Sequence, residues 1–279
     1  LNLVSRPAVR GLAIVAFTSV SDALASLKAI LATDPAAVEL VDDVVIATAR
    51  ANAEYRVYVE LMPQPASGPL GAVLYVEYFG DAPDGIHDRF DALRRAVPAA
   101  ATAFYTGVPE MARAWRLRKA GEPLLHGIPG LRKPITFVED TAVDPARLPE
   151  FVEEFRAIVE RHGTTAAYYA HASVGCLHIR PLVNMRDPAD RTIMESIASE
   201  VADLVVRYGG ALSGEHGDGR VRSPFLRRYF GDVICDAFDE VKAIFDPASR
   251  MNPGNIVAPG RMLEHLRIRP TTREVEVPP

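Results

Sequence analysis

The sequence lacks several features that would place a protein in a functional class at once. Its 279 residues include only two cysteines, Cys176 and Cys235, so neither a disulfide framework nor a cysteine-built zinc site is expected. No apolar run reaches the ~18–20 residues needed to span a bilayer. With 31 basic and 36 acidic residues the net charge is −5, which excludes a global field that attracts nucleic acid. We therefore expect a cytoplasmic protein that does not bind nucleic acid.

The chain also begins, at Leu1-Asn2-Leu3, without a methionine or a signal-peptide layout. This start predicts a piece of a longer protein. What is present is typical of a folded chain, because 48% hydrophobic and 24% charged residues can form one large core or two smaller ones. We expect one domain over residues 1–266. Residues 267–279 are polar and proline-rich, and we expect a loosely ordered tail there.

Strand-like and helix-like segments alternate through the first two thirds of the chain. Alternating β-branched and aromatic residues predict strands at 11–17, 55–61, 73–79, 102–106 and 135–139. Apolar residues at i, i+3 and i+4 predict helices at 21–32, 83–97 and 145–162. Single helices between strands favour an α+β fold, a mainly antiparallel sheet with ferredoxin-like strand–helix–strand units and helices packed on it. A doubly wound dinucleotide fold is disfavoured, because Gly11 stands alone before the first strand.

The last third has a different pattern. Tyr168 to Val183 reads as a pair of strands, and a long helix from Asp187 to about Tyr208 has an Asp-Pro start and a Gly-Gly stop. A glycine-rich loop over residues 213–219 follows, and then a helix over 233–245. We expect this part to form a C-terminal helical segment.

Two histidines flank the predicted turn of the strand pair. If Val174-Gly175 forms a two-residue hairpin turn, His171 lies directly across from His178. Cross-strand neighbours have Cβ atoms ~4.5–5.5 Å apart on one face of a sheet. The two imidazoles can therefore form one edge of a metal site.

Glu215 and His216, in the glycine-rich loop, offer a carboxylate and a third imidazole. Two imidazoles and one carboxylate with an open position suit zinc, manganese or iron(II), and His216 is then left as a candidate base. On the residues alone, a structural role for both motifs stays open. So do a free-standing metallohydrolase, which would act without flavin, and a non-catalytic interaction domain.

The order of several motifs resembles the C-terminal domain of FAD-linked oxidases. These are vanillyl-alcohol-oxidase-type flavoproteins that include D-lactate, glycolate and 2-hydroxyglutarate dehydrogenases. The motifs that carry the resemblance are His171-x6-His178, Gly209-Gly210-x-x-Ser213-Gly214-Glu215-His216-Gly217, Phe245-Asp246-Pro247 and Asn252-Pro253-Gly254. The variant Ser-Gly-Glu-His-Gly-Asp-Gly is similar to that of long bacterial members, which also carry an iron–sulfur domain. An iron–sulfur cluster elsewhere in the full-length protein is therefore one implication.

The resemblance implies a role for each motif residue. It makes His171, His178 and Glu215 the ligands of a divalent metal, with zinc as the first expectation and manganese or iron as alternatives. His216 becomes the catalytic base.

It also implies contacts to substrate and cofactor. Arg118 and Lys133 occupy the places of residues that grip a substrate carboxylate, with Arg116 as an alternative to Arg118. Asn252 and Asn255 fall where relatives contact the flavin, although many relatives have lysine at the second place.

The function implied is oxidation of a D-2-hydroxy acid to the 2-oxo acid, by metal-assisted proton abstraction and hydride transfer to FAD. Because this chain has no pyrophosphate-binding loop, we expect a flavin domain of the same polypeptide to hold most of the FAD. The fragment alone is then inactive. An electron acceptor is a further implied partner, and peripheral membrane association of the full-length enzyme stays open. The sequence identifies neither the acceptor nor which hydroxy acid is the substrate.

Overall fold

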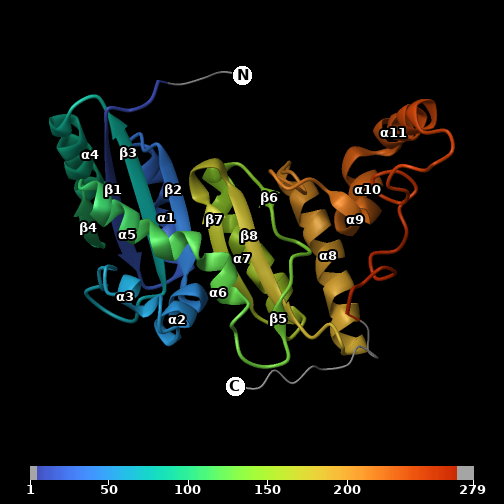
Figure 1. Ribbon diagram of the computed structural model, residues 1–279, viewed down its shortest axis with the longest axis horizontal. Helices are drawn as coiled ribbons and strands as arrows, with labels where there is room; N and C mark the ends of the chain where they lie inside the picture. Colours follow the sequence, from blue (N-terminus) through green and yellow to red (C-terminus); the bar gives the residue numbers. More distant parts are fainter. Residues whose placement is uncertain (1–4, 269–279) are drawn as a thin grey trace. The chain divides into compact units, whose positions relative to one another are not determined.

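The computed structural model describes residues 5–268, and they divide into two compact units. The first unit contains the chain up to Ile128, then Val143–Glu153 and Ala167–Ile179. The second contains Pro129–Ala142, Glu154–Ala166 and the chain from Arg180 onward. Figure 1 labels the elements of both units.

An antiparallel sheet forms the centre of the first unit (Figure 1). Its strands run in the order β4-β1-β3-β2-β7. Their bounds are β1 Val9–Phe17, β2 Ala37–Asp42, β3 Ala72–Gly80, β4 Ala101–Tyr105 and β7 Ala166–His171. The middle of β1 is buried on both faces, which explains why its sequence is a continuous apolar run.

Helices cover this sheet and connect its strands. Their bounds are α1 Val20–Leu31, α2 Asp43–Ala51, α3 Arg56–Val59, α4 Pro83–Ala96, α5 Val108–Lys119 and α6 Gly121–Leu125. A 3₁₀ turn at Pro145–Arg147 leads into α7, Leu148–Arg161, whose last part belongs to the second unit. The expected α+β class with a mainly antiparallel sheet is confirmed.

The predicted strand at 55–61 is wrong. Tyr55 to Val59 alternates like a strand, but Val57 is exposed and the segment forms the short helix α3. The strand beside β3 is instead β2, which the sequence pattern did not reveal.

The predicted strand at 135–139 is also wrong. The strand in this region is the two-residue β5, Lys133–Pro134, which pairs with β8, and the chain then turns. Asp140 adopts a φ of 71°, in the left-handed region, which is incompatible with continuing a strand.

The second unit is mainly helical. Its elements are the last part of α7, β5, β6 Thr141–Ala142, the end of β8 Cys176–Val183, α8 Pro188–Tyr208, α9 Gly219–Arg222, a 3₁₀ turn at Ser223–Phe225, α10 Leu226–Phe230 and α11 Asp232–Phe245. The long helix α8 confirms its signals: the Asp187 side chain accepts the Ala189 N–H at 2.9 Å, and Gly209 ends the helix with a φ of 62°.

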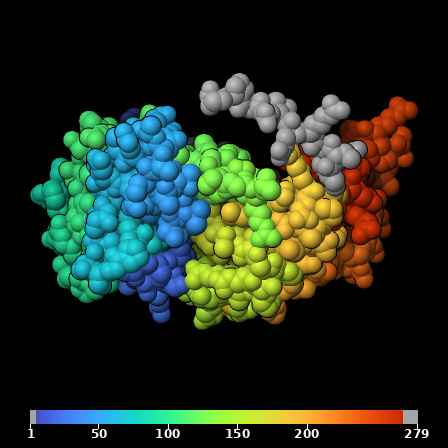
Figure 2. Space-filling view, turned by 90° about the horizontal axis from the view of Figure 1, so that it is seen from below, coloured from blue at the N-terminus to red at the C-terminus, as the bar shows by residue number. Residues whose placement is uncertain are grey.

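The C-terminal helical segment is drawn in orange and red in Figure 2. On α11, Val233, Ile244 and Phe245 are exposed. Within residues 5–268, no helix combines the length and the apolar character needed to cross a membrane. The expected loose tail at 267–279 lies, from residue 269 onward, outside the described residues.

Candidate functional site

The two hairpin histidines sit in the first unit, on β7 and β8. The predicted two-residue turn is wrong, because the strands are joined by four residues, a 3₁₀ turn at Ala172–Val174 followed by Gly175. Gly175 has a φ of 73°, and a Cβ added there would lie 1.8 Å from the carbonyl oxygen of Val143. Only glycine fits this turn.

The expected closeness of His171 and His178 is confirmed. Their ring centroids are 5.1 Å apart, with the planes at 88°. His178 is buried and stacks on Tyr169 at 4.9 Å, whereas the side chain of His171 is 34% exposed. One imidazole is therefore held by the core and the other reaches the surface.

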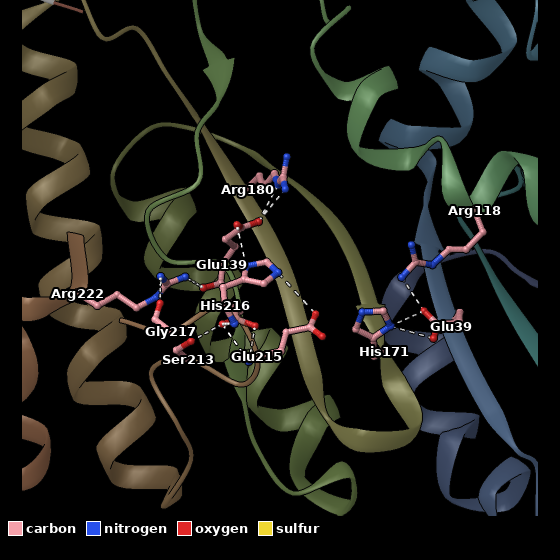
Figure 3. A network of polar contacts seen from close by, with 11 residues as sticks. Glu39, Arg118, Glu139, His171, Arg180, Ser213, Glu215, His216, Gly217 and Arg222 are labelled. Carbon is pink, nitrogen blue, oxygen red and sulfur yellow. Dashed lines mark hydrogen bonds and ion pairs between the residues drawn. The ribbon is translucent and has the colours of Figure 1, made fainter. Parts of the chain in front are cut away.

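Glu39, a residue that the sequence analysis missed, lies beside His171. It is the cross-strand partner of His171 on β7 and of Tyr75 on β3. The Nδ1 atom of His171 lies 2.9 Å from each carboxylate oxygen of Glu39. Arg118 donates from a terminal guanidinium nitrogen to the same carboxylate at 2.6 Å (Figure 3).

Helix α5 brings Arg118 to this place. Trp115, one turn earlier, stacks on Tyr75 with ring centroids 5.4 Å apart. The guanidinium carbon of Arg118 lies 5.3 Å from the centroid of the Tyr169 ring, and the side chain is only 11% exposed. Arg116, the alternative, is 57% exposed and lies 3.7 Å from Glu54. Arg118 is thus the arginine that contacts the histidine network.

Glu215 and His216 lie in the second unit, in a loop that Asp140 anchors. The fully buried carboxylate of Asp140 accepts the N–H of Glu215 at 3.1 Å, the N–H of His216 at 2.8 Å and the hydroxyl of Ser213. Its backbone carbonyl accepts the N–H of Gly214 at 2.7 Å. The loop has no regular hydrogen-bond pattern of its own, so Asp140 fixes its course.

A second buried carboxylate, Glu139, lies next to the His216 ring (Figure 3). Arg180 donates to one oxygen of Glu139 at 2.9 Å, and the Nδ1 of His216 lies 3.4 Å from the other. The Nε2 of His216 lies 3.6 Å from the carboxylate of Glu215. Arg222 donates to the backbone carbonyls of Glu139 and Gly217.

The donor atoms of this loop and of Asp140 suit a metal ion. Asp140, Glu215 and His216 each offer a ligand atom, and these atoms lie within 4.8 Å of one another. Glu215 and His216 are about half exposed, so a ligand can reach them. Burial raises the pKa of Asp218, in the same loop.

Lys133 lies on β5 of the second unit. It lines a pocket with Val183, Arg186 and Ile268, and none of the loop residues 213–219 lines that pocket. Lys133 and His216 therefore do not share this pocket.

The segment with Asn252 and Asn255 is a loop held by Asp246 of the Phe-Asp-Pro motif. Asp246 accepts the N–H groups of Arg250 and Met251, and the hydrogen bond from Lys242 lowers its pKa to about 2. Asn255 donates to the side chain of Asn252 at 2.5 Å. The Oδ1 atom of Asn255 is buried and has no hydrogen-bond partner among the described residues, so it can accept one from a ligand.

Known proteins of similar sequence align with most of this chain. Residues 6–256 match the family of FAD linked oxidases, C-terminal domain. The D-2-hydroxyglutarate dehydrogenase of Pseudomonas putida is 33% identical over 265 residues, which cover 93% of this chain and 26% of that protein. The enzyme of the same name from Escherichia coli is 33% identical over 268 residues, with the same coverage. The chain thus spans about a quarter of the length of these relatives.

Solved structures show the same fold. The 4-ethylphenol oxidase from Gulosibacter chungangensis matches with a TM-score of 0.60 at 17% identity, covering 95% of this chain and 56% of that one. A p-cresol methylhydroxylase matches with a TM-score of 0.60 at 14% identity, covering 90% of this chain and 53% of that one. Sequence motifs, fold and family match agree, and the chain belongs to the family of the C-terminal domains of FAD linked oxidases.

Proposed function

We propose that this chain is the substrate-binding part of an FAD-dependent enzyme that oxidises a D-2-hydroxy acid to the 2-oxo acid. The family match supports flavin-linked oxidation, and relatives that align over nearly the whole chain are named D-2-hydroxyglutarate dehydrogenase. The observation that carries the proposal furthest is the close pair of imidazoles at His171 and His178. A separate motif of the sequence supplies a carboxylate, Glu215.

In this proposal His171, His178 and Glu215 hold a divalent metal, with zinc as the first choice. The donor chemistry fits, since zinc favours imidazole nitrogen and carboxylate oxygen. The carboxylate of Glu39 at the Nδ1 atom of His171 is the arrangement common for metal-ligating histidines. A bound metal would lower the pKa of the substrate hydroxyl and orient it.

The chain's own residues then bind substrate and move a proton. His216 takes the proton of the C2 hydroxyl, a role that suits an imidazole that is neutral near pH 7. The buried carboxylate of Glu139 lies 3.4 Å from the Nδ1 atom of His216 and would stabilise the positive charge that the imidazole gains. Arg118 binds a carboxylate through its planar guanidinium, and Lys133 contributes a second positive charge.

FAD would accept the hydride from C2. Among the residues of this chain, Asn252 and Asn255 are proposed to contact it, because Asn255 has a buried acceptor atom without a partner in the described part. We propose that a flavin domain of the full-length protein holds the rest of the cofactor. An electron acceptor, and an iron–sulfur cluster in another part of that protein, complete the proposal.

Replacing His216 tests the catalytic role. In the full-length enzyme with FAD, His216→Ala should lower kcat for a D-2-hydroxy acid about 10²–10⁴-fold while KM stays nearly constant. The matched control is His87→Ala on the exposed face of α4, which should leave both constants unchanged. Full turnover in His216→Ala would contradict the assignment. Hydrolytic activity without FAD, and no oxidation of the hydroxy acid with it, would favour a metallohydrolase.

A further inference from the structure

Glu39 lies at the centre of the polar network in the first unit, and no motif of the sequence marks it. Its carboxylate contacts His171 and Arg118 at once, at 2.9 and 2.6 Å (Figure 3). We propose that Glu39 is a positioning residue that fixes the imidazole of His171 for the metal and the guanidinium of Arg118 for the substrate carboxylate. This inference rests on the proposed function.

The contact with His171 selects one tautomer of the imidazole. An ionised carboxylate is only an acceptor, and both oxygens of Glu39 lie 2.9 Å from Nδ1. In the neutral imidazole, this geometry favours the tautomer with the hydrogen on Nδ1 and the lone pair on Nε2. Metal-ligating histidines in proteins commonly donate their other N–H to a carboxylate, which fixes the ring and raises its basicity as a ligand. Nε2 of His171 is thus the atom prepared for the metal.

The sheet holds Glu39 in place without help from a loop. Glu39 is on β2, which pairs with β3 on one side and with β7 on the other. Because Glu39 and His171 are direct cross-strand partners, their side chains project from the same face. The side chain of Glu39 is 13% exposed, so little water competes for its oxygens.

The contact with Arg118 leaves that side chain with further donor capacity. One terminal nitrogen binds Glu39, while the buried Nε–H has no acceptor among the described residues. Buried donors are nearly always paired in folded proteins, so an unpaired one at a suspected binding site points to a ligand. The ring of Tyr169 beneath the guanidinium restricts its orientation further. A carboxylate is the ligand that a guanidinium accepts best.

Glu39 as a direct metal ligand is the competing interpretation. Both of its oxygens are already engaged by Nδ1 of His171, and one also accepts from Arg118. A metal bound there would have to displace the cation at 2.6 Å. The geometry therefore favours an indirect role, through His171 and Arg118.

Zinc affinity of the full-length protein, measured by competition with a chelator, tests this role. Glu39→Ala removes the acceptor, and the dissociation constant for zinc should rise about 10–100-fold. Glu39→Gln keeps the size and one acceptor oxygen but loses the charge. Its dissociation constant for zinc should therefore lie between those of the unchanged protein and of Glu39→Ala. In both variants KM for the hydroxy acid should rise, because Arg118 loses its partner. The matched control is Glu77→Gln, a part-buried glutamate on β3 that pairs with Arg10 and should bind zinc as the unchanged protein does.

The outcomes separate this inference from the function on which it rests. If the unchanged protein binds zinc and both Glu39 variants bind it equally well, the role of Glu39 is wrong and the metal site stands. If the unchanged protein binds no zinc, the metal site is wrong and the role of Glu39 falls with it. Should Glu39→Ala fail to fold, the isosteric Glu39→Gln decides alone: a weakened zinc affinity supports the role, and an unchanged one overturns it.

Discussion

The two units hold their candidate site residues in different ways. In the first unit, Glu39 lies on the regular strand β2, and its carboxylate binds the side chains of His171 and Arg118. In the second, the carboxylate of Asp140 accepts backbone N–H groups of the loop that carries Glu215 and His216. A sheet already fixes its backbone through strand pairing, so a carboxylate there can act on side chains. A glycine-rich loop has no such pairing and needs a buried carboxylate to fix its course.

The two arginine–glutamate pairs extend this contrast. Arg180 and Glu139 of the second unit are 2% and 7% exposed, whereas Arg118 and Glu39 of the first are 11% and 13% exposed. The Arg180–Glu139 pair is buried in the core, whereas the Arg118–Glu39 pair keeps some access to solvent. We therefore expect the buried pair to matter most for stability and the more accessible pair to matter most for binding.

The largest effect on the free energy of unfolding is expected when the two glutamates, Glu139 and Glu39, are replaced in turn. Glu139→Ala removes the carboxylate that the buried Arg180 binds at 2.9 Å, and the free energy of unfolding should fall by about 3–5 kcal/mol. Glu39→Ala should cost about 1–3 kcal/mol, as expected for charged hydrogen bonds that are partly solvated. Urea denaturation of the two variants measures the difference. Equal losses would show that the contrast between the two pairs is wrong.

A smaller effect is expected from removing the loop anchor. Asp140→Ala leaves two backbone N–H groups and a hydroxyl without their acceptor, which should lower the free energy of unfolding by about 2–3 kcal/mol and abolish turnover. The control, Asp187→Ala, removes an exposed helix cap on α8 and should cost about 1 kcal/mol with normal turnover. Normal turnover in Asp140→Ala would mean that the loop does not need this anchor.

The smallest effect concerns Asp42, which lies on the same strand as Glu39 but accepts backbone N–H groups, those of Val45 and Tyr168. Burial raises the pKa of Asp42 from 3.8 to about 7. The folded state therefore holds its proton more tightly than the unfolded state, and the free energy of unfolding should fall as pH rises between these two values. From pH 5.5 to 6.5 the loss should be about 1 kcal/mol.

Asp42→Asn has no proton to lose and should remove this part of the pH dependence. The free energy of unfolding of both proteins, measured by urea denaturation at pH 5.5 and 6.5, gives the comparison. Parallel pH dependences would show that Asp42 is ionised in the folded protein throughout this range.

Local signals predicted much of the fold. The Asp-Pro start and Gly-Gly stop of α8 gave both of its ends, and the turn between His171 and His178 gave the closeness of their rings. The length of that turn was wrong, because the fit of Gly175 against Val143 depends on a contact distant in sequence.

The anchoring carboxylates could not be predicted, because their partners are far away along the chain. Glu39 lies 132 residues before His171, and Asp140 lies 76 residues before His216. The wrong prediction of a strand at 55–61, where α3 forms instead, has the same origin. Val57 fits a strand pattern, but β2 already occupies the place beside β3. Only the pairing of strands brings such residues together.

The most direct test of the central claim is the metal content of the full-length protein, measured by elemental mass spectrometry. We expect about one zinc, manganese or iron per chain in addition to the iron of the proposed iron–sulfur cluster. This additional metal should be lost in both His171→Ala and Glu215→Ala and retained in the His87→Ala control. Absence of the additional metal, or its retention in both ligand variants, would contradict the proposed site.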